Sequence, residues 1–121
     1  MSTPFRRVLI VDDVKAIRAF LKTVLYRKGH IKAVEAEDGE QAIRILQNEE
    51  FDLIISDFCM PNVDGHALFK WVYENRPELS KHFVFITAYG GEEGLTSLLE
   101  EHPTVPVIGK PFSASDLEKF L

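Results

Sequence analysis

The stretch VLIVDD, residues 8–13, decides the fold, because an unbroken apolar run is followed at once by two acidic residues. A run without alternating polar positions is typical of a strand that is buried on both faces, as in a parallel sheet. Similar runs occur in DLIISD, residues 52–57, which ends in an acid, and in FVFIT, residues 83–87, which ends in a threonine. Buried strands that each end with a polar side chain are therefore predicted.

Helical patterns follow these strands and give the chain an alternating order. Apolar residues at helical spacing follow the first strand, and Gly29 can cap that helix in the left-handed conformation. A second helix is predicted to begin at Asp38, which can form a capping box with Gln41, and a third at Asp64. The predicted buried stripe of the first helix consists of Ile17, Phe20, Leu21, Val24 and Leu25.

The remaining segments complete the pattern. A mixed strand over residues 31–37, nearer the sheet edge, precedes the second helix, and a short helix is expected around Leu95. A last strand over residues 105–109 leads to a helix capped by Ser113. The order βα, repeated five times, predicts a single doubly wound α/β domain whose parallel sheet has helices on both faces. We expect one domain over residues 1–121, with its last helix cut short by the end of the chain.

The composition is that of a protein with a packed core and an acidic surface. The chain has 121 residues, of which 45% are hydrophobic and 27% charged, and its formal net charge is -5. An acidic surface repels phosphate backbones and anionic lipid, so we expect no direct nucleic-acid partner and no membrane partner. No apolar stretch approaches the roughly 20 residues that span a bilayer. One cysteine, Cys59, allows no internal disulfide, which fits the reducing cytoplasm where we expect the protein.

The polar residues at the strand ends are the candidate functional residues. Asp12 and Asp13 end the first strand, Asp57 the third and Thr87 the fourth, and Lys110 follows the fifth. In open parallel sheets, ligands bind in the crevice beyond the carboxyl ends of the strands. Carboxylates gathered there need a cation, and oxygen ligands favour Mg²⁺, Mn²⁺ or Ca²⁺ over zinc. A nucleophilic carboxylate, a divalent metal, a lysine and a hydroxyl are the groups that phosphoryl transfer requires.

Four motifs in this order give the chain a family resemblance. They are LIVDD at residues 9–13, DFCMP at 57–61 with DG at 64–65, TA at 87–88, and KPF at 110–112. With these motifs the chain resembles, over nearly its whole length, the receiver domain of bacterial two-component response regulators, in the CheY-like superfamily. The resemblance implies a flavodoxin-like (βα)5 fold with the sheet order 2-1-3-4-5, which brings the first and third strands together.

The resemblance also implies a role for each strand-end residue in a phosphorelay. Asp57 is similar to the phosphoacceptor, which forms an aspartyl phosphate. Thr87 and Lys110 would bind the phosphoryl group, and Ala88 would leave room for it. The Lys110–Pro111 peptide bond is expected to be cis.

The resemblance further implies a metal site that holds Mg²⁺ or Mn²⁺. Asp13 would be a direct ligand and Asp12 a ligand through water, and Asp57 and the backbone carbonyl of Cys59 would complete the protein's share. The phosphoryl donor would be a sensor histidine kinase or a histidine phosphotransfer protein, and the recipient of the signal a downstream protein or a fused output domain. The chain is not expected to be an enzyme beyond its own phosphorylation and dephosphorylation.

One departure from the family pattern concerns the switch. Receivers often carry a tyrosine or phenylalanine three residues before the lysine, whereas this chain has Val107. Thr87 could still draw the following loop inward, since the Gly90–Gly91 pair makes that loop soft. Tyr89 is a nearby aromatic residue that could report the change instead, and its bulk could shield the site from water.

Other functions remain open at this point. A strand-end aspartate alone often only caps a helix, and a threonine there is often only a β-former. A pseudo-receiver, which binds proteins without being phosphorylated, is one alternative. The complete set of acids with Thr87 and Lys110 argues against it, whereas Val107 in place of the usual aromatic residue leaves room for it. A phosphatase with an aspartyl nucleophile would need a second acid two residues beyond Asp57, where Cys59 stands.

Overall fold

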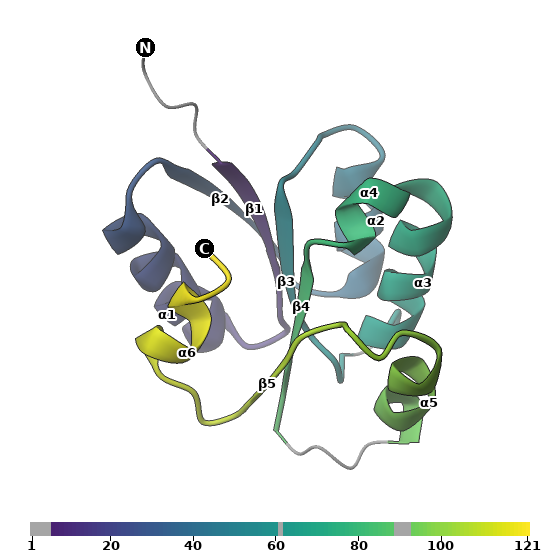
Figure 1. Cartoon of the computed structure of the whole chain (residues 1–121). Helices are drawn as coiled ribbons and strands as arrows, with labels where there is room; N and C mark the ends of the chain where they lie inside the picture. Colours follow the sequence, from purple (N-terminus) through teal and green to yellow (C-terminus); the bar gives the residue numbers. More distant parts are fainter. Residues whose placement is uncertain (1–5, 61, 89–92) are drawn as a thin grey trace.

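A parallel sheet forms the centre of the molecule. The computed structural model describes residues 6–60, 62–88 and 93–121. Within them, five parallel strands pair in the order β2-β1-β3-β4-β5 (Figure 1), which confirms the predicted fold class and strand order. The strands are β1 (Arg6–Val11), β2 (Ile31–Ala36), β3 (Leu53–Asp57), β4 (Phe83–Thr87) and β5 (Val107–Gly109).

Helices cover both faces of this sheet (Figure 1). Helices α1 (Lys15–Lys28) and α6 (Ala114–Glu118) lie on one face, and α2 (Gly39–Leu46), α3 (Gly65–Asn75) and α5 (Glu93–Glu101) lie on the other. The sequence patterns missed α4 (Pro77–Ser80), a single turn after α3 that begins with a proline, where the missing N–H is not needed. Among the described helices, none has both the length and the apolar character that a membrane span requires.

Side-chain alternation along the strands divides the core into two layers. Leu9 packs in the layer beneath α2, α3 and α5, whereas Ile10 and Ile55 pack in the layer beneath α1 and α6. Successive side chains of a strand point to opposite faces. Asp12 and Asp57 therefore continue the alternation of Ile10 and Ile55, toward the α1 side of the sheet.

The stripe predicted for α1 is wrong at one position. Phe20 is 41% exposed, while Arg18, which was not predicted to be buried, is 8% exposed. The helix turns Arg18, Leu21 and Leu25 toward the sheet, so the side of the helix that carries Phe20 faces outward. The Phe20 ring instead packs edge-to-face on Phe112, with the ring centroids 5.5 Å apart.

The helix caps and strand boundaries are mostly as predicted, with two differences. Asp38 accepts a hydrogen bond from the N–H of Gln41, but the Gln41 side chain accepts from the N–H of Glu37 rather than closing the predicted box on Asp38. The box at Ser113 is complete. Strand β5 begins at Val107 rather than at residue 105, because Pro106 has no N–H to donate to a neighbouring strand.

Gly65, the first residue of α3, packs closely against the end of β3. Its N–H donates to the carbonyl oxygen of Phe58 at 2.8 Å, and a Cβ on it would lie 2.8 Å from the carbonyl oxygen of Asp57. We expect Gly65→Ala to lower the free energy of unfolding by about 1–3 kcal/mol, because α3 must move away from the strand end. Urea denaturation measures this. Gly109→Ala is the control, since a Cβ there meets nothing within 4 Å, and equal losses in both variants would contradict the steric explanation.

Candidate functional site

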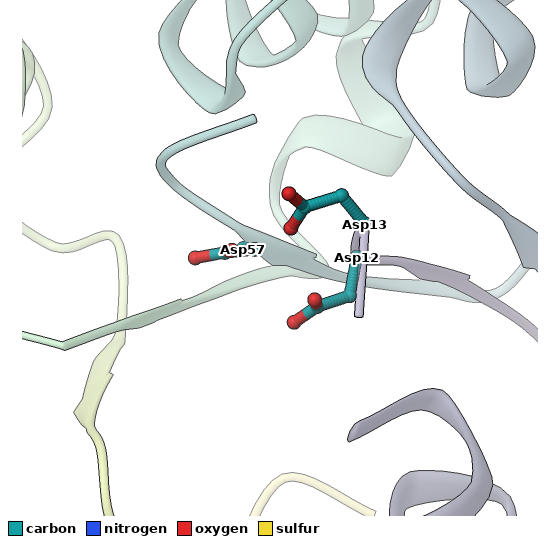
Figure 2. Close-up of side chains that lie close together, drawn as sticks. All are labelled: Asp12, Asp13 and Asp57. Carbon is teal, nitrogen blue, oxygen red and sulfur yellow. The ribbon is translucent and has the colours of Figure 1, made fainter. Parts of the chain in front are cut away.

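The ends of β1 and β3 bring the acidic residues together. These strands pair with Val11 opposite Ser56, so the next residues, Asp12 and Asp57, stand side by side at the end of the sheet. One carboxylate oxygen from each of Asp12, Asp13 and Asp57 lies within 4.8 Å of the other two. Figure 2 shows the three groups gathered at the two strand ends. Asp12 and Asp57 are buried, whereas Asp13 is exposed and faces the solvent side of the cluster.

Lys110 brings a positive charge to these acids from the end of β5. Its backbone N–H donates to the carbonyl oxygen of Thr87 at 2.7 Å, which ties the end of β5 to the end of β4. The Lys110–Pro111 bond is cis, as expected. The Lys110 Nζ atom lies 3.4 Å from Oδ2 of Asp12 and 3.5 Å from Oδ2 of Asp57. One lysine therefore acts as counterion to both buried carboxylates.

The other predicted residues lie around this centre or beyond the described part of the chain. Thr87 is buried at the end of β4, and Ala88 follows it as an exposed residue. Cys59 is exposed two positions after Asp57. The expectations placed on Tyr89, on Gly90–Gly91 and on Pro61 of the second motif concern positions outside the described residues.

One backbone hydrogen bond and one from a side chain hold the end of β3 in place. The N–H of Phe58 donates to the carbonyl oxygen of Ile86 at 3.0 Å, and the hydroxyl of Ser56 donates to the carbonyl oxygen of Asp57 at 2.8 Å. Because β3 is flanked by β1 and β4, this strand end has little freedom to move. The Asp57 carboxylate is thus presented from a rigid element, which is what a reaction with directional requirements needs.

Burial changes the protonation of the two inner acids. Burial, which disfavours the charged carboxylate, and repulsion from Asp12 raise the pKa of Asp57 to about 6, although Lys110 acts in the opposite direction. Burial likewise raises the pKa of Asp12, against the hydrogen bond from the Val14 N–H and the attraction of Lys110. Both carboxylates are destabilised as anions, so a cation placed between them would be bound favourably.

The donor atoms of the cluster fit a hard divalent cation. Its three side chains offer only carboxylate oxygens, which suit Mg²⁺, Mn²⁺ or Ca²⁺ better than the softer metals that prefer nitrogen or sulfur. The ammonium group of Lys110 can form an ion pair with a negatively charged ligand that binds next to Asp57. The arrangement is therefore suited to bring an anionic, phosphate-like group against the Asp57 carboxylate.

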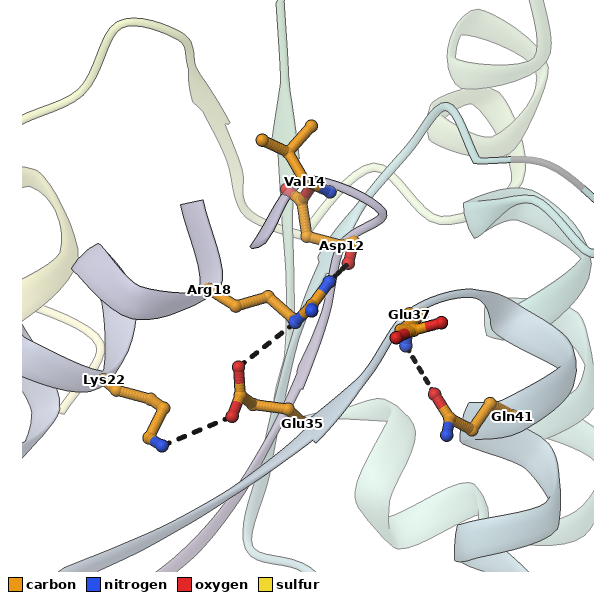
Figure 3. A network of polar contacts seen from close by, with 7 residues as sticks. All are labelled: Asp12, Val14, Arg18, Lys22, Glu35, Glu37 and Gln41. Carbon is orange, nitrogen blue, oxygen red and sulfur yellow. Dashed lines mark hydrogen bonds and ion pairs between the residues drawn. The ribbon is translucent and has the colours of Figure 1, made fainter. Parts of the chain in front are cut away.

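A buried arginine behind the cluster was missed by the sequence patterns (Figure 3). Nη1 of Arg18 donates to the backbone carbonyl oxygen of Asp12 at 2.6 Å, and its Nε donates to Glu35 at 3.1 Å. Nζ of Lys22 lies 3.3 Å from the other carboxylate oxygen of Glu35. The signal was present in the sequence: Arg18 interrupts an apolar stripe of α1, and Glu35 shares the alternation of the inward-facing Ile31 and Ala33.

An apolar groove of about 550 Å³ lies beside the lysine. It runs between α1 and the segment that follows β5, and its wall includes the exposed Phe20 and its partner Phe112. The residues that line it are Ile17, Phe20, Ala88, Lys110, Pro111 and Phe112. The cluster thus has an apolar surface immediately next to its charged part.

Comparison with known proteins gives a consistent result. The model of the response regulator receiver domain matches residues 8–121. The "Probable chemotaxis protein CheY" of Rhizobium etli is 32% identical over 112 residues, which cover 93% of this chain and 86% of that protein. The "Response regulator protein FleR" of Pseudomonas aeruginosa is 33% identical over 111 residues, which cover 92% of this chain but only 23% of that longer protein.

A solved structure with the same architecture contains a metal complex. The response regulator protein TrrA of Thermotoga maritima, in complex with Mg(2+)-BeF, superposes with a TM-score of 0.79 at 26% identity. The match covers 97% of this chain and 100% of that chain. Like the two relatives, it is similar to this chain in the whole region that forms the sheet and the acidic cluster.

The raised pKa of Asp57 predicts how Asp57→Asn changes stability with pH. The folded pKa is about 6 against 3.8 for the ordinary group, so the buried anion weakens the fold as pH rises through 6. In EDTA, we expect the asparagine variant to exceed wild type in free energy of unfolding by roughly 2 kcal/mol near pH 7.5, and by little near pH 4. Urea denaturation at both pH values measures this. A gain that is the same at both pH values would contradict the explanation.

Proposed function

The chain belongs to the family of response regulator receiver domains, and we propose that it works in a two-component phosphorelay by accepting a phosphoryl group on Asp57. The observation that carries this proposal is the buried carboxylate of Asp57, 3.5 Å from the lysine ammonium and within 4.8 Å of two further carboxylates. The phosphorylated domain would then present a changed surface to a partner. Residues 1–121 would form one receiver unit.

The transfer step needs only one nucleophile from this chain. An oxygen of the ionised Asp57 carboxylate attacks the phosphorus of a phosphohistidine or of a small acyl phosphate. The bond between phosphorus and the donor nitrogen or oxygen breaks, and the donor keeps that electron pair. A histidine donor then takes a proton from solvent. The product is an aspartyl phosphate on Asp57 and a dephosphorylated donor.

The acidic cluster would hold Mg²⁺, or Mn²⁺ in its place, while this step occurs. We propose Asp13 as a direct ligand, Asp12 as a ligand through water, and Asp57 and the backbone carbonyl of Cys59 as the remaining protein ligands. The metal supplies charge stabilisation to the transferring phosphoryl oxygens. The carboxylate donor set supports this choice, and so does the Mg(2+)-BeF complex of the similar protein TrrA.

Three residues at the carboxyl ends of β4 and β5, or directly after them, would receive the phosphoryl group. The Lys110 ammonium, which already faces Asp57, would pair with one of its oxygens. Thr87 would donate its hydroxyl to another oxygen. Ala88, which has only a methyl side chain, would leave space beside them. Because the reaction ends on the protein itself, we propose that the domain is a signalling module and not an enzyme acting on free substrates.

The apolar groove borders Lys110, so a protein donor that reaches the cluster can pack against it. We propose that a sensor histidine kinase or a histidine phosphotransfer protein packs an apolar surface on Phe20 and Phe112, next to Lys110. This would place its phosphohistidine over Asp57. A downstream protein or a fused output domain would read the phosphorylated state, without direct contact with nucleic acid or membrane, in the cytoplasm.

The change of state would reach α5 without an aromatic residue at position 107. Phe58 follows Asp57 directly and its ring is buried against Phe85, with the ring centroids 5.3 Å apart. A Cβ on Gly94 would lie 3.2 Å from this ring, so α5 begins in contact with it. We propose that phosphorylation moves α5 through this contact.

The chemistry of phosphoryl transfer can be tested with a small donor. Incubation with acetyl phosphate and Mg²⁺ is expected to add one phosphoryl group to the wild-type chain, as measured by intact mass. Asp57→Asn is expected to give no adduct, and neither is wild type in EDTA. An adduct on Asp57→Asn would contradict the assignment of the acceptor. No adduct on wild type, even with phosphohistidine donors, would favour a pseudo-receiver.

The proposed donor surface can be tested by a substitution in the groove. Phe20→Ala is expected to slow phosphorylation by about tenfold or more when the donor is a histidine phosphotransfer protein that phosphorylates wild type, because it removes an exposed aromatic contact. The rate with acetyl phosphate should stay unchanged, since a small donor does not need this surface. Tyr26→Ala is the control, because Tyr26 is an exposed aromatic on the same helix but does not line the groove. Equal slowing with both donors would show that Phe20 supports the site rather than the partner.

A further inference from the structure

Arg18 is the one described charged residue of a helix that is buried against the acidic cluster from behind. It makes no contact that the structure records with the carboxylates themselves; it holds the backbone of Asp12 instead. We propose that Arg18 is a positioning residue for the divalent-metal site, which fixes the peptide group between Asp12 and Asp13 and so sets the direction of both side chains. This inference rests on the proposed metal site.

Three hydrogen bonds hold Asp12, and the one from Arg18 also affects the position of Asp13. The N–H of Asp12 donates to the carbonyl oxygen of Ala36 at 3.1 Å, which continues the pairing of β1 with β2. One carboxylate oxygen of Asp12 accepts from the N–H of Val14 at 2.8 Å. The carbonyl oxygen of Asp12 accepts from Arg18 at 2.6 Å. That carbonyl belongs to the same planar peptide as the nitrogen of Asp13, so fixing it fixes where the chain leaves toward Asp13.

The local sequence provides little other support for this turn. The N-terminus of α1 begins after Val14, which makes no side-chain cap, and the first turn carries no acidic residue. Asp13 is exposed, so burial does little to orient its side chain. The bond from Arg18 is therefore the described contact that best defines the peptide plane preceding Asp13.

Glu35 keeps the guanidinium in place and offsets its charge. It accepts from Nε of Arg18 and also pairs with Lys22 (Figure 3). Burial would raise the pKa of Glu35, but the hydrogen bonds from Lys22 and Arg18 outweigh it and lower that pKa, so the residue is ionised at neutral pH. Arg18, Glu35 and Lys22 together carry one net positive charge, but Arg18 reaches the site through the carbonyl oxygen of Asp12, so it acts on the site mainly through geometry. Lys110 lies directly beside the carboxylates and acts through charge.

The test measures Mg²⁺ affinity directly, without phosphorylation. Isothermal titration of Mg²⁺ into the phosphoryl-free protein is expected to give an affinity about tenfold or more lower for Arg18→Met than for wild type, as for other residues that orient metal ligands. Glu35→Gln leaves Arg18 present but loosens it, and a several-fold loss is expected. Arg44→Met is the matched control, because Arg44 pairs with Glu40 on the exposed face of α2, away from the site.

Phosphorylation kinetics separate positioning from simple loss of stability. With acetyl phosphate, the Mg²⁺ concentration for half-maximal rate should rise in Arg18→Met by the same factor as the dissociation constant, while the rate at saturating Mg²⁺ returns close to wild type. Thermal melting in EDTA identifies the fraction folded, and Glu35→Gln serves if Arg18→Met does not fold. A lower melting temperature with unchanged Mg²⁺ affinity would overturn the inference. Wild type that binds no Mg²⁺ would overturn the proposed function as well, and the two failures are thus distinguishable.

Discussion

Two carboxylates buried side by side repel each other, and the ammonium group of Lys110 offsets the repulsion between Asp12 and Asp57. The parallel pairing of β1 and β3 places both acids at neighbouring strand ends, and burial raises the pKa of each. Lys110 is held by β5 at a similar distance from both. An isolated buried anion is strongly unfavourable, so a charged cluster of this kind persists only where the surrounding fold is stable enough to impose it.

The sheet provides that stability through its central strands. β1 and β3 are covered on both faces, and their side chains fill two separate layers of the core. The acids stand at the one edge of this rigid unit where the strands end, and polar groups there can reach solvent without interrupting the core. The two roles are thus divided along each strand: apolar residues pack it in the core, and the candidate site residues stand at its carboxyl end or just after it.

Strand-end residues and the alternating order of elements were predictable because they follow from local patterns. VLIVDD and DLIISD mark buried strands, and the crevice rule for parallel sheets indicates where their acids meet. The contacts of Arg18 with Glu35 and Asp12 were not predictable, because they join a helix, an edge strand and a turn that only the folded chain brings together. The exposure of Phe20 was not predicted for a related reason. Two adjacent stripes along α1 carry apolar residues, and which of them is buried depends on how the helix packs on the sheet.

The position of Lys110 between two acids has a consequence for how the domain is used over time. An internal counterion makes the cluster tolerable before any cation arrives, so ligand binding is not required to complete the fold, unlike in small domains that fold only around their metal. Under the proposed phosphorelay, the domain would therefore have the same folded state before and after each transfer. No refolding would then separate one round of phosphorylation from the next.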